Sequence, residues 1–201
     1  MSSTTHKYSR IIKEAASRHG FMGAGIARAE HMDEEAARLE QWLCEGHHGE
    51  MAYMANHFDM RVDPTKLVPG AKSVISLVYN YYPGEREAKA EAKAKEGLLL
   101  TTHNSQLTKT SSDAAKQPEE ENFKISRYAY GEDYHKVVRR KLKALVNELK
   151  KEIGDFNARV FVDSAPVLER DWAKRSGQGW IGKNTLLIHP KKGSYFFLAE
   201  I

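Results

Sequence analysis

Cysteine is almost absent from this sequence of 201 residues, which contains only Cys44. One cysteine cannot form an internal disulfide, and it cannot supply the thiolates of an iron–sulfur cluster or a thiolate zinc site. Long apolar runs are absent too, because no stretch approaches the roughly 18 uncharged apolar residues of a membrane span, and the N-terminus lacks the apolar core of a signal peptide. We therefore expect a cytoplasmic protein with no membrane partner.

A histidine-rich segment is present, but it lacks the spacing of a metal site. His47, His48, Glu50 and His57 lie close together in the sequence without an HExxH pattern and without a second cysteine nearby. We assign these residues to a surface turn and a short helix, and we predict no metal site.

The composition indicates one domain, residues 1–201, with one insertion. Hydrophobic residues make up 41% of the chain, enough for one substantial core. Residues 85–121 are dominated by Ala, Lys, Glu, Ser, Thr and Gln, so we expect a flexible surface insertion with little role in the chemistry. The net charge of +4 is compatible with a polyanionic partner, but many soluble proteins are as basic.

Apolar periodicity predicts alternating helices and strands. Helices are expected at 8–19, at 33–43 with Asp33 as the N-cap, at 133–153, and at 166–176 with Pro166 in the first turn. Strands are expected at 21–27, 73–82, 158–162, 185–189 and 194–201. This order favours an α/β (α+β) sandwich with a central mixed sheet flanked by helices. The apolar run at the end is either the last strand or the edge of a fragment, and we favour a fragment of a longer protein.

Three sequence blocks carry a family resemblance. They are MRVDPTKLVPGAKSVISLVYNYYP at 60–83, KISRYAYGEDYHKVVRRKL at 124–142, and VDSAPVLERDWAKRSGQGWIGKNTLLIHPKKGSYFFLAEI at 162–201. Together they resemble the N-terminal, cobalamin-binding part of epoxyqueuosine reductases, oxidoreductases of queuosine biosynthesis that act on the tRNA anticodon loop. The resemblance implies a fold similar to cobalamin-dependent reductive enzymes and nitroreductase-like proteins.

The family also implies parts that this chain lacks. Full-length members continue into a ferredoxin-type domain that holds two [4Fe–4S] clusters, whereas this chain has no cluster ligands. Its electrons would have to come from a missing ferredoxin-type segment or from a separate donor.

Asp163 is the candidate catalytic residue. It follows the apolar run ARVFV, and in the family the aspartate of the matching VD motif is proposed to donate a proton while low-valent cobalt reduces the epoxide. Opening an epoxide develops negative charge on its oxygen, and a nearby acid can neutralise this charge by donating a proton. A carboxyl group still carries its proton near neutral pH only if burial or an electron-rich neighbour raises its pKa. Without the family resemblance, the alternative is that Asp163 is a helix N-cap or a turn residue before Pro166.

Cofactor contacts follow from the resemblance and compete with ordinary structural roles. Arg61 is expected to contact the corrinoid, or else to form a surface salt bridge with Asp59 or Asp63. The loop around Gly131 supplies polar and aromatic side chains, which more often pack on the core. The glycine-rich stretch 176–188 does not have Walker A spacing. The expected corrinoid contacts are Arg61, Ser126, Tyr130, Lys183, Asn184, Leu187 and Leu198, with Asp133 and Tyr134 in the same loop as Ser126 and Tyr130.

Basic residues near Asp163 are candidates for contact with tRNA. Arg170, Lys174 and Arg175 are the predicted substrate contacts, and a second basic cluster lies on the helix at 133–153. A solvated helix face is the commoner reason for such runs.

Two other functions stay open at this point. One is a non-catalytic corrinoid-binding or carrier protein that lost its redox domain, and the other is a nitroreductase-like flavin enzyme. The cofactor that copurifies with the protein would distinguish the flavin enzyme from both corrinoid proteins.

Overall fold

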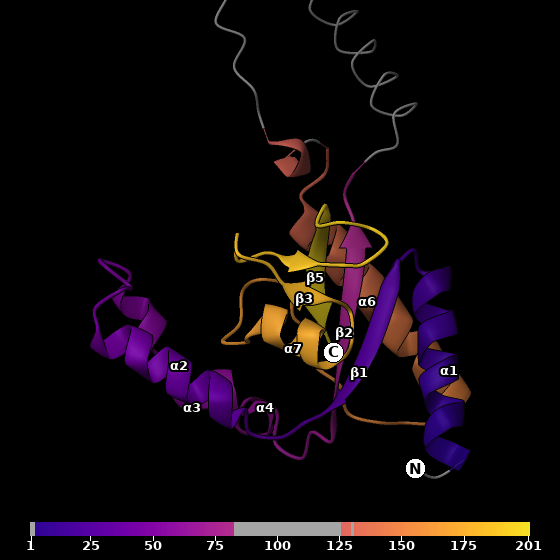
Figure 1. Ribbon diagram of the computed structural model, residues 1–201. Coiled ribbons are helices and arrows are strands. Elements are labelled where there is room, and N and C mark those ends of the chain that lie inside the picture. The colour runs from indigo at the N-terminus through magenta and orange to yellow at the C-terminus, as the bar shows by residue number, and fades with distance from the viewer. Residues whose placement is uncertain (1–2, 83–125, 130) are drawn as a thin grey trace, which may run out of the picture. The chain divides into compact units, whose positions relative to one another are not determined.

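The computed structural model describes residues 3–82, 126–129 and 131–201 (Figure 1). Its contacts divide the chain into one unit of residues 1–81 and 131–201, and a second unit of residues 82–130. The described part of the second unit holds one 3-10 turn, η2 (Arg127–Ala129). The predicted insertion at 85–121 lies outside the described residues, so its flexibility stays a prediction.

A three-stranded sheet forms the centre of the first unit. Its strands are β1 (Gly23–Arg28), β2 (Ser73–Asn80) and β5 (Phe196–Glu200), in the order β1-β2-β5. Both pairings are antiparallel, so the predicted mixed sheet is wrong for the described strands. The segment between β1 and β2 leaves and re-enters the sheet at the same end, where Ala29 N–H donates to the carbonyl of Lys72. Such a return makes neighbouring strands antiparallel, whereas a crossover would make them parallel.

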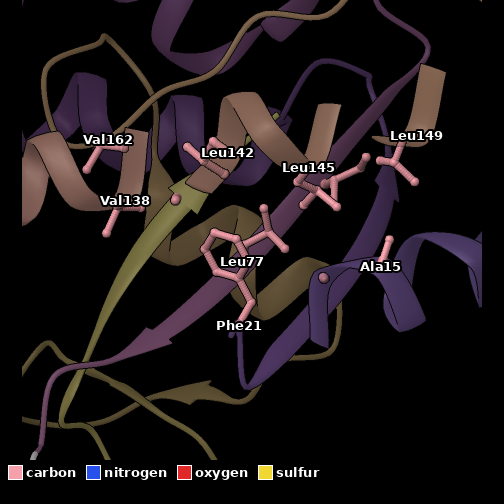
Figure 2. Packing of buried hydrophobic residues seen from close by; sticks show 11 residues of the cluster. Ala15, Phe21, Leu77, Val138, Leu142, Leu145, Leu149 and Val162 are labelled. Carbon is pink, nitrogen blue, oxygen red and sulfur yellow. The ribbon is translucent and has the colours of Figure 1, made fainter. Parts of the chain in front are cut away.

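Two helices cover one face of this sheet. They are α1 (Ser3–Arg18) and α6 (Tyr134–Ile153), and the apolar stripe of α6 is fully buried as its period of 3.6 predicts. Leu142, Leu145 and Leu149 of α6 pack with Leu77 of β2 and Ala15 of α1 (Figure 2). This cluster fixes α6, and therefore the position of its first turn.

The opposite face of the sheet carries α7 (Glu169–Arg175) and a small hairpin made of β3 (Trp180–Ile181) and β4 (Leu187–Ile188). Ala173 of α7 and Leu187 of β4 pack against Val78 of β2. The segment after α7 lies so close to β1 that a Cβ on Gly25 would come within 2.5 Å of the carbonyl oxygen of Ser176. The glycines of β1 thus permit a close backbone approach.

The excursion between β1 and β2 is helical. It contains α2 (Asp33–Cys44), η1 (Ala52–Ala55), α3 (Phe58–Val62) and α4 (Pro64–Leu67). The prediction that Asp33 caps α2 is wrong, because Met32 occupies the N-cap and Asp33 is the first helical residue. The side chain of Asp63 does cap α4, by accepting from Thr65 N–H.

Several predicted boundaries near the candidate acid shift. The strand predicted at 158–162 reduces to one antiparallel bridge between Phe161 and Glu200, because β5 ends at Glu200 and the chain turns at Asp163. The helix predicted from Pro166 begins at Glu169, since Val167 N–H closes a tight turn onto the carbonyl of Ala165. Residues 162–168 therefore form a loop.

Candidate active site

Asp163 lies in this loop, immediately after the buried Val162. Its backbone is left-handed, with φ of +54°, and its side chain is 38% exposed. A left-handed aspartate is uncommon and requires the surrounding structure to hold it. The predicted candidate is therefore a partly exposed carboxyl group in a constrained turn, and it does not cap α7, whose N-cap is Leu168.

The first turn of α6 supplies two neighbours of the Asp163 carboxyl. The hydroxyl of Tyr134 donates to Asp163 Oδ2, and His135 Nε2 lies 3.4 Å from the same oxygen. Tyr134 is held by parallel stacking on Phe197 of β5, with ring centroids 3.8 Å apart. Because the α6 stripe is buried, both side chains are presented from a rigid support.

Asp133 is the N-cap of α6 and orients His135. Its carboxylate accepts from the backbone N–H of His135 at 3.0 Å and contacts His135 Nδ1 at 2.8 Å. The hydrogen bonds from His135 lower the pKa of Asp133, so this carboxyl group stays ionised at neutral pH.

Glu169, the first residue of α7, holds the backbone of the candidate acid. Glu169 Oε1 accepts from Asp163 N–H at 2.9 Å. Burial, followed by the nearby charge of Asp163, raises the pKa of Glu169 to about 7. Near neutral pH this carboxyl group is therefore protonated in much of the population.

A second buried carboxyl group lies behind Glu169. Glu200 of β5 is 1% exposed, and among the described residues neither of its carboxyl oxygens has a hydrogen-bond partner. Burial raises its pKa well above the ordinary value, and the charges of Glu169 and Asp163 act in the same direction. Burial thus favours the neutral form of the Glu200 carboxyl group.

The arrangement suits proton donation. The Asp163 carboxyl group is exposed on one side, receives a phenol hydrogen bond and contacts a histidine, while a half-buried glutamic acid accepts from the backbone N–H of the same residue. Such a group can give a proton to an oxygen that develops negative charge.

The β3–β4 hairpin presents the predicted polar residues beside large apolar ones. Lys183 and Asn184 are exposed in its turn, and Trp180 and Leu186 are 50% and 47% exposed. Arg170 of α7 donates to the carbonyl of Thr185 in the same turn. Because Glu169 and Arg170 are adjacent, α7 connects the Asp163 loop to the hairpin turn.

The other predicted corrinoid contacts are more scattered. Leu187 is buried in β4, and Leu198 is partly buried in β5. Ser126 is exposed in the second unit, and Tyr130 lies outside the described residues. Arg61 donates through Nε to the carbonyl of Asn56, rather than to Asp59 or Asp63, and lies on the wall of a cavity of about 670 Å³.

That cavity does not include Asp163. Arg61, Trp172 and Glu200 are among its lining residues, and most of its wall is apolar. We place the candidate active site at Asp163 instead, because hydrogen bonds converge there on an exposed ionisable group, and the cavity shows no such convergence among its described residues.

Two of the predicted tRNA contacts already bind other groups of the protein, and the third is exposed. Arg170 binds the carbonyl of Thr185, and Arg175 pairs with Glu30 and lies over the ring of Trp172. Lys174 is exposed. From the basic cluster on α6, Arg139 reaches Ser164 Oγ at 3.3 Å, next to Asp163.

The part of the chain that the structure describes contains no group of three or more His, Cys, Asp or Glu side chains placed to hold a metal ion. None of its helices is both long and apolar enough to cross a membrane.

Sequence reasoning missed three residues of the site: His135, Glu169 and Glu200. Glu200 had a visible signal, since it is a lone charge inside the apolar run SYFFLAEI. Glu169 and His135 had none, because only the fold brings α6 and α7 to the Asp163 loop.

Comparison with known proteins gives one consistent family. Residues 61–164 match the family model described as epoxyqueuosine reductase QueG, DUF1730. The chain is 49% identical to the epoxyqueuosine reductase of Cyclobacterium marinum, over 99% of this chain and 55% of the relative. It is 42% identical to the Pseudomonas aeruginosa enzyme, over 97% of this chain and 47% of the relative. The chain thus spans about half the length of the curated relatives it matches.

Solved structures of epoxyqueuosine reductases have the same fold. One, determined with an epoxyqueuosine-modified tRNA-Tyr stem loop, matches with a TM-score of 0.72 and 26% identity, over 97% of this chain and 44% of that chain. Another, from Bacillus subtilis, has an aspartate catalytic loop swung out of its active site and matches with a TM-score of 0.69, 26% identity, and coverage of 97% of this chain and 44% of that chain.

Proposed function

The chain belongs to the epoxyqueuosine reductase family, as its sequence blocks predicted, and from this premise we propose that it serves the reduction of epoxyqueuosine to queuosine in tRNA, with Asp163 as the proton donor. The observation that carries the proposal is the convergence of Tyr134 and Glu169 on Asp163, within a fold shared with solved epoxyqueuosine reductases. The activity is proposed as an oxidoreductase reaction that this chain performs together with an electron donor.

Asp163 acts on the oxygen of the epoxide. Reduction of an epoxide to an alkene consumes two electrons and two protons, and the oxygen leaves as water. The Asp163 carboxyl gives one proton to this oxygen as the C–O bond breaks, which prevents the build-up of an alkoxide. Tyr134 holds the side chain of Asp163 and Glu169 holds its backbone, so that the carboxyl faces the substrate in one orientation.

Cobalamin is the cofactor that we propose for this site. A corrinoid has broad apolar faces and an amide-bearing edge, and the β3–β4 hairpin exposes Trp180 and Leu186 beside Lys183 and Asn184. This donor set fits such a ligand, with Leu187 and Leu198 contributing backbone groups. The proposal of Arg61, Ser126 and Tyr130 as further contacts rests on the family resemblance alone. When bound, the cofactor supplies reducing electrons to the epoxide carbon.

The electron supply is proposed to lie outside these 201 residues. The single Cys44 cannot hold a [4Fe–4S] cluster, so a ferredoxin-type segment or a separate iron–sulfur donor would deliver the electrons. The proposed setting is the cytoplasm.

The proposed substrate is the anticodon loop of a queuosine-containing tRNA. A relative bound to an epoxyqueuosine-modified stem loop supports it, and so do the basic side chains around Asp163. Lys174 is exposed for phosphate contact, while Arg170 and Arg175 can add charge to the same surface.

One experiment tests the proposal. The protein is mixed with cobalamin, a low-potential reductant and an epoxyqueuosine-containing tRNA stem loop, and the nucleosides are then quantified by mass spectrometry. Conversion to queuosine above the protein-free control is expected, together with a shift of the corrinoid absorbance. Cobalamin binding without conversion would favour a carrier, and a copurifying flavin would favour a nitroreductase-like enzyme.

A further inference from the structure

His135 makes contacts that the proposed reaction leaves unexplained. Asp163 loses a proton in each turnover and must regain one before the next. Among the described residues, four ionisable side chains lie close to its carboxyl group: Tyr134 and His135 from α6, Glu169 from α7, and Glu200 from β5. Arg139 approaches the same loop through Ser164, but an arginine does not give up its proton in proteins.

These side chains differ in their exposure to solvent. Glu200 is buried and Glu169 is half-buried, whereas the His135 side chain is 44% exposed. Tyr134 is stacked on Phe197 and already donates its hydroxyl hydrogen to Asp163. His135 is thus the group that meets both bulk water and the carboxyl of Asp163.

The hydrogen bonds of His135 determine which ring nitrogen donates to Asp133 and which one can exchange a proton with Asp163. Asp133 is ionised and can only accept, so His135 Nδ1 carries a hydrogen and donates it to Asp133 Oδ1 at 2.8 Å. The exchangeable position is then Nε2, which lies 3.4 Å from Asp163 Oδ2. Stacking on Tyr134, with ring centroids 4.0 Å apart, keeps the imidazole in this orientation.

We propose that His135 is a positioning residue that returns a proton from solvent to Asp163, oriented for this step by Asp133. The inference rests on the proposed function, since it assigns to Asp163 a proton that is consumed in each turnover. In the step, the Nε2–H bond of the imidazolium breaks and an O–H bond forms on Asp163 Oδ2, so the imidazole and the carboxyl both become neutral. His135 then takes a proton from water, and no electrons move.

His135→Ala is the principal variant. Without the proton carrier, kcat for epoxyqueuosine reduction should fall on the order of tenfold to a hundredfold, with the largest loss at alkaline pH, where water supplies protons poorly. Added imidazole should restore a substantial part of the activity, because the site is exposed. His135→Gln should stay impaired, since glutamine keeps a hydrogen-bond donor but cannot carry the proton.

The chain offers a matched control. His31 is equally exposed and also contacts a carboxylate, with Nδ1 at 2.7 Å from Asp33 Oδ1, but it is not among the contacts of Asp163. His31→Ala should keep wild-type kcat and show no response to imidazole.

The outcomes separate the two proposals. A wild-type protein that converts no substrate contradicts the proposed function. An active wild type with unchanged kcat in His135→Ala, or full activity in His135→Gln, overturns the role of His135.

Ring ¹⁵N NMR of the unliganded chain tests the hydrogen-bond geometry without turnover. In the neutral ring of the wild type, Nδ1 should be the protonated nitrogen, and this preference should be lost in Asp133→Asn. If the neutral ring in the wild type instead carries its hydrogen on Nε2, the proposed role of His135 is overturned.

Discussion

Glu169→Gln offers the sharpest test of the electrostatics around Asp163. Glutamine has nearly the same shape and can still accept the hydrogen bond from Asp163 N–H, but it does not titrate. The variant therefore removes the proton equilibrium of Glu169 and leaves the packing of α7 in place.

The magnitude follows from the pKa shift. Folding raises the pKa of Glu169 from the ordinary 4.5 to about 7, so the folded state holds a proton that the unfolded state loses. The resulting stabilisation is complete below pH 4.5, is lost as the pH rises from 4.5 to 7, and changes no further above pH 7. The wild-type free energy of unfolding should thus fall by about 3 kcal/mol across this window because of Glu169, at 1.36 kcal/mol per unit.

Urea unfolding followed by circular dichroism at pH 5 and pH 8 measures this difference. The loss of stability between the two pH values should be about 2.5 kcal/mol smaller in Glu169→Gln than in the wild type, because a part of the full effect is already lost at pH 5. Glu200 also destabilises the protein as the pH rises, and burial, the largest cause of its raised pKa, acts on it in both proteins. Glu34→Gln, on the exposed surface of α2, is the control and should behave as the wild type does. Parallel pH dependence in wild type and Glu169→Gln would refute the reasoning.

Three further predictions concern other parts of the chain. Tyr134→Phe keeps the ring that stacks on Phe197 but removes the donor to Asp163, so kcat should fall about tenfold with an unchanged thermal midpoint; an unchanged kcat would contradict the role of the hydroxyl. Leu142→Ala empties a fully buried position and should cost about 2–5 kcal/mol in urea unfolding, and a loss below about 1 kcal/mol would mean that this cluster is not the core. Lys174→Gln should weaken tRNA binding and reduce the slope of log affinity against log salt by about 1, measured by filter binding, whereas an unaltered slope would exclude a phosphate contact.

The sequence predicted the elements that depend on local pattern. The helix predicted at 133–153 matches α6 almost to the residue, and the strand predicted at 73–82 begins at the first residue of β2 and ends two residues beyond it. The family could also be predicted from the sequence, because the three motif blocks occur in the family's order along the chain.

The parts that sequence reasoning got wrong depend on non-local contacts. Nothing in residues 158–162 shows that β5 is too short to pair with more than Phe161, so the predicted strand became a single bridge. Strand direction is set by where the helical excursion returns, and this made the sheet antiparallel. Asp163 was found from its motif, but its pairing with His135 and Glu169 required the fold.

The most direct test of the central claim compares wild type with Asp163→Asn in the reduction of an epoxyqueuosine-containing tRNA stem loop, with cobalamin binding measured in the same samples. Asparagine keeps the size of the side chain but cannot donate a carboxyl proton. We expect a loss of queuosine formation of at least about a hundredfold, with cobalamin binding retained. Wild-type rates in Asp163→Asn would contradict the role of Asp163 as the proton donor.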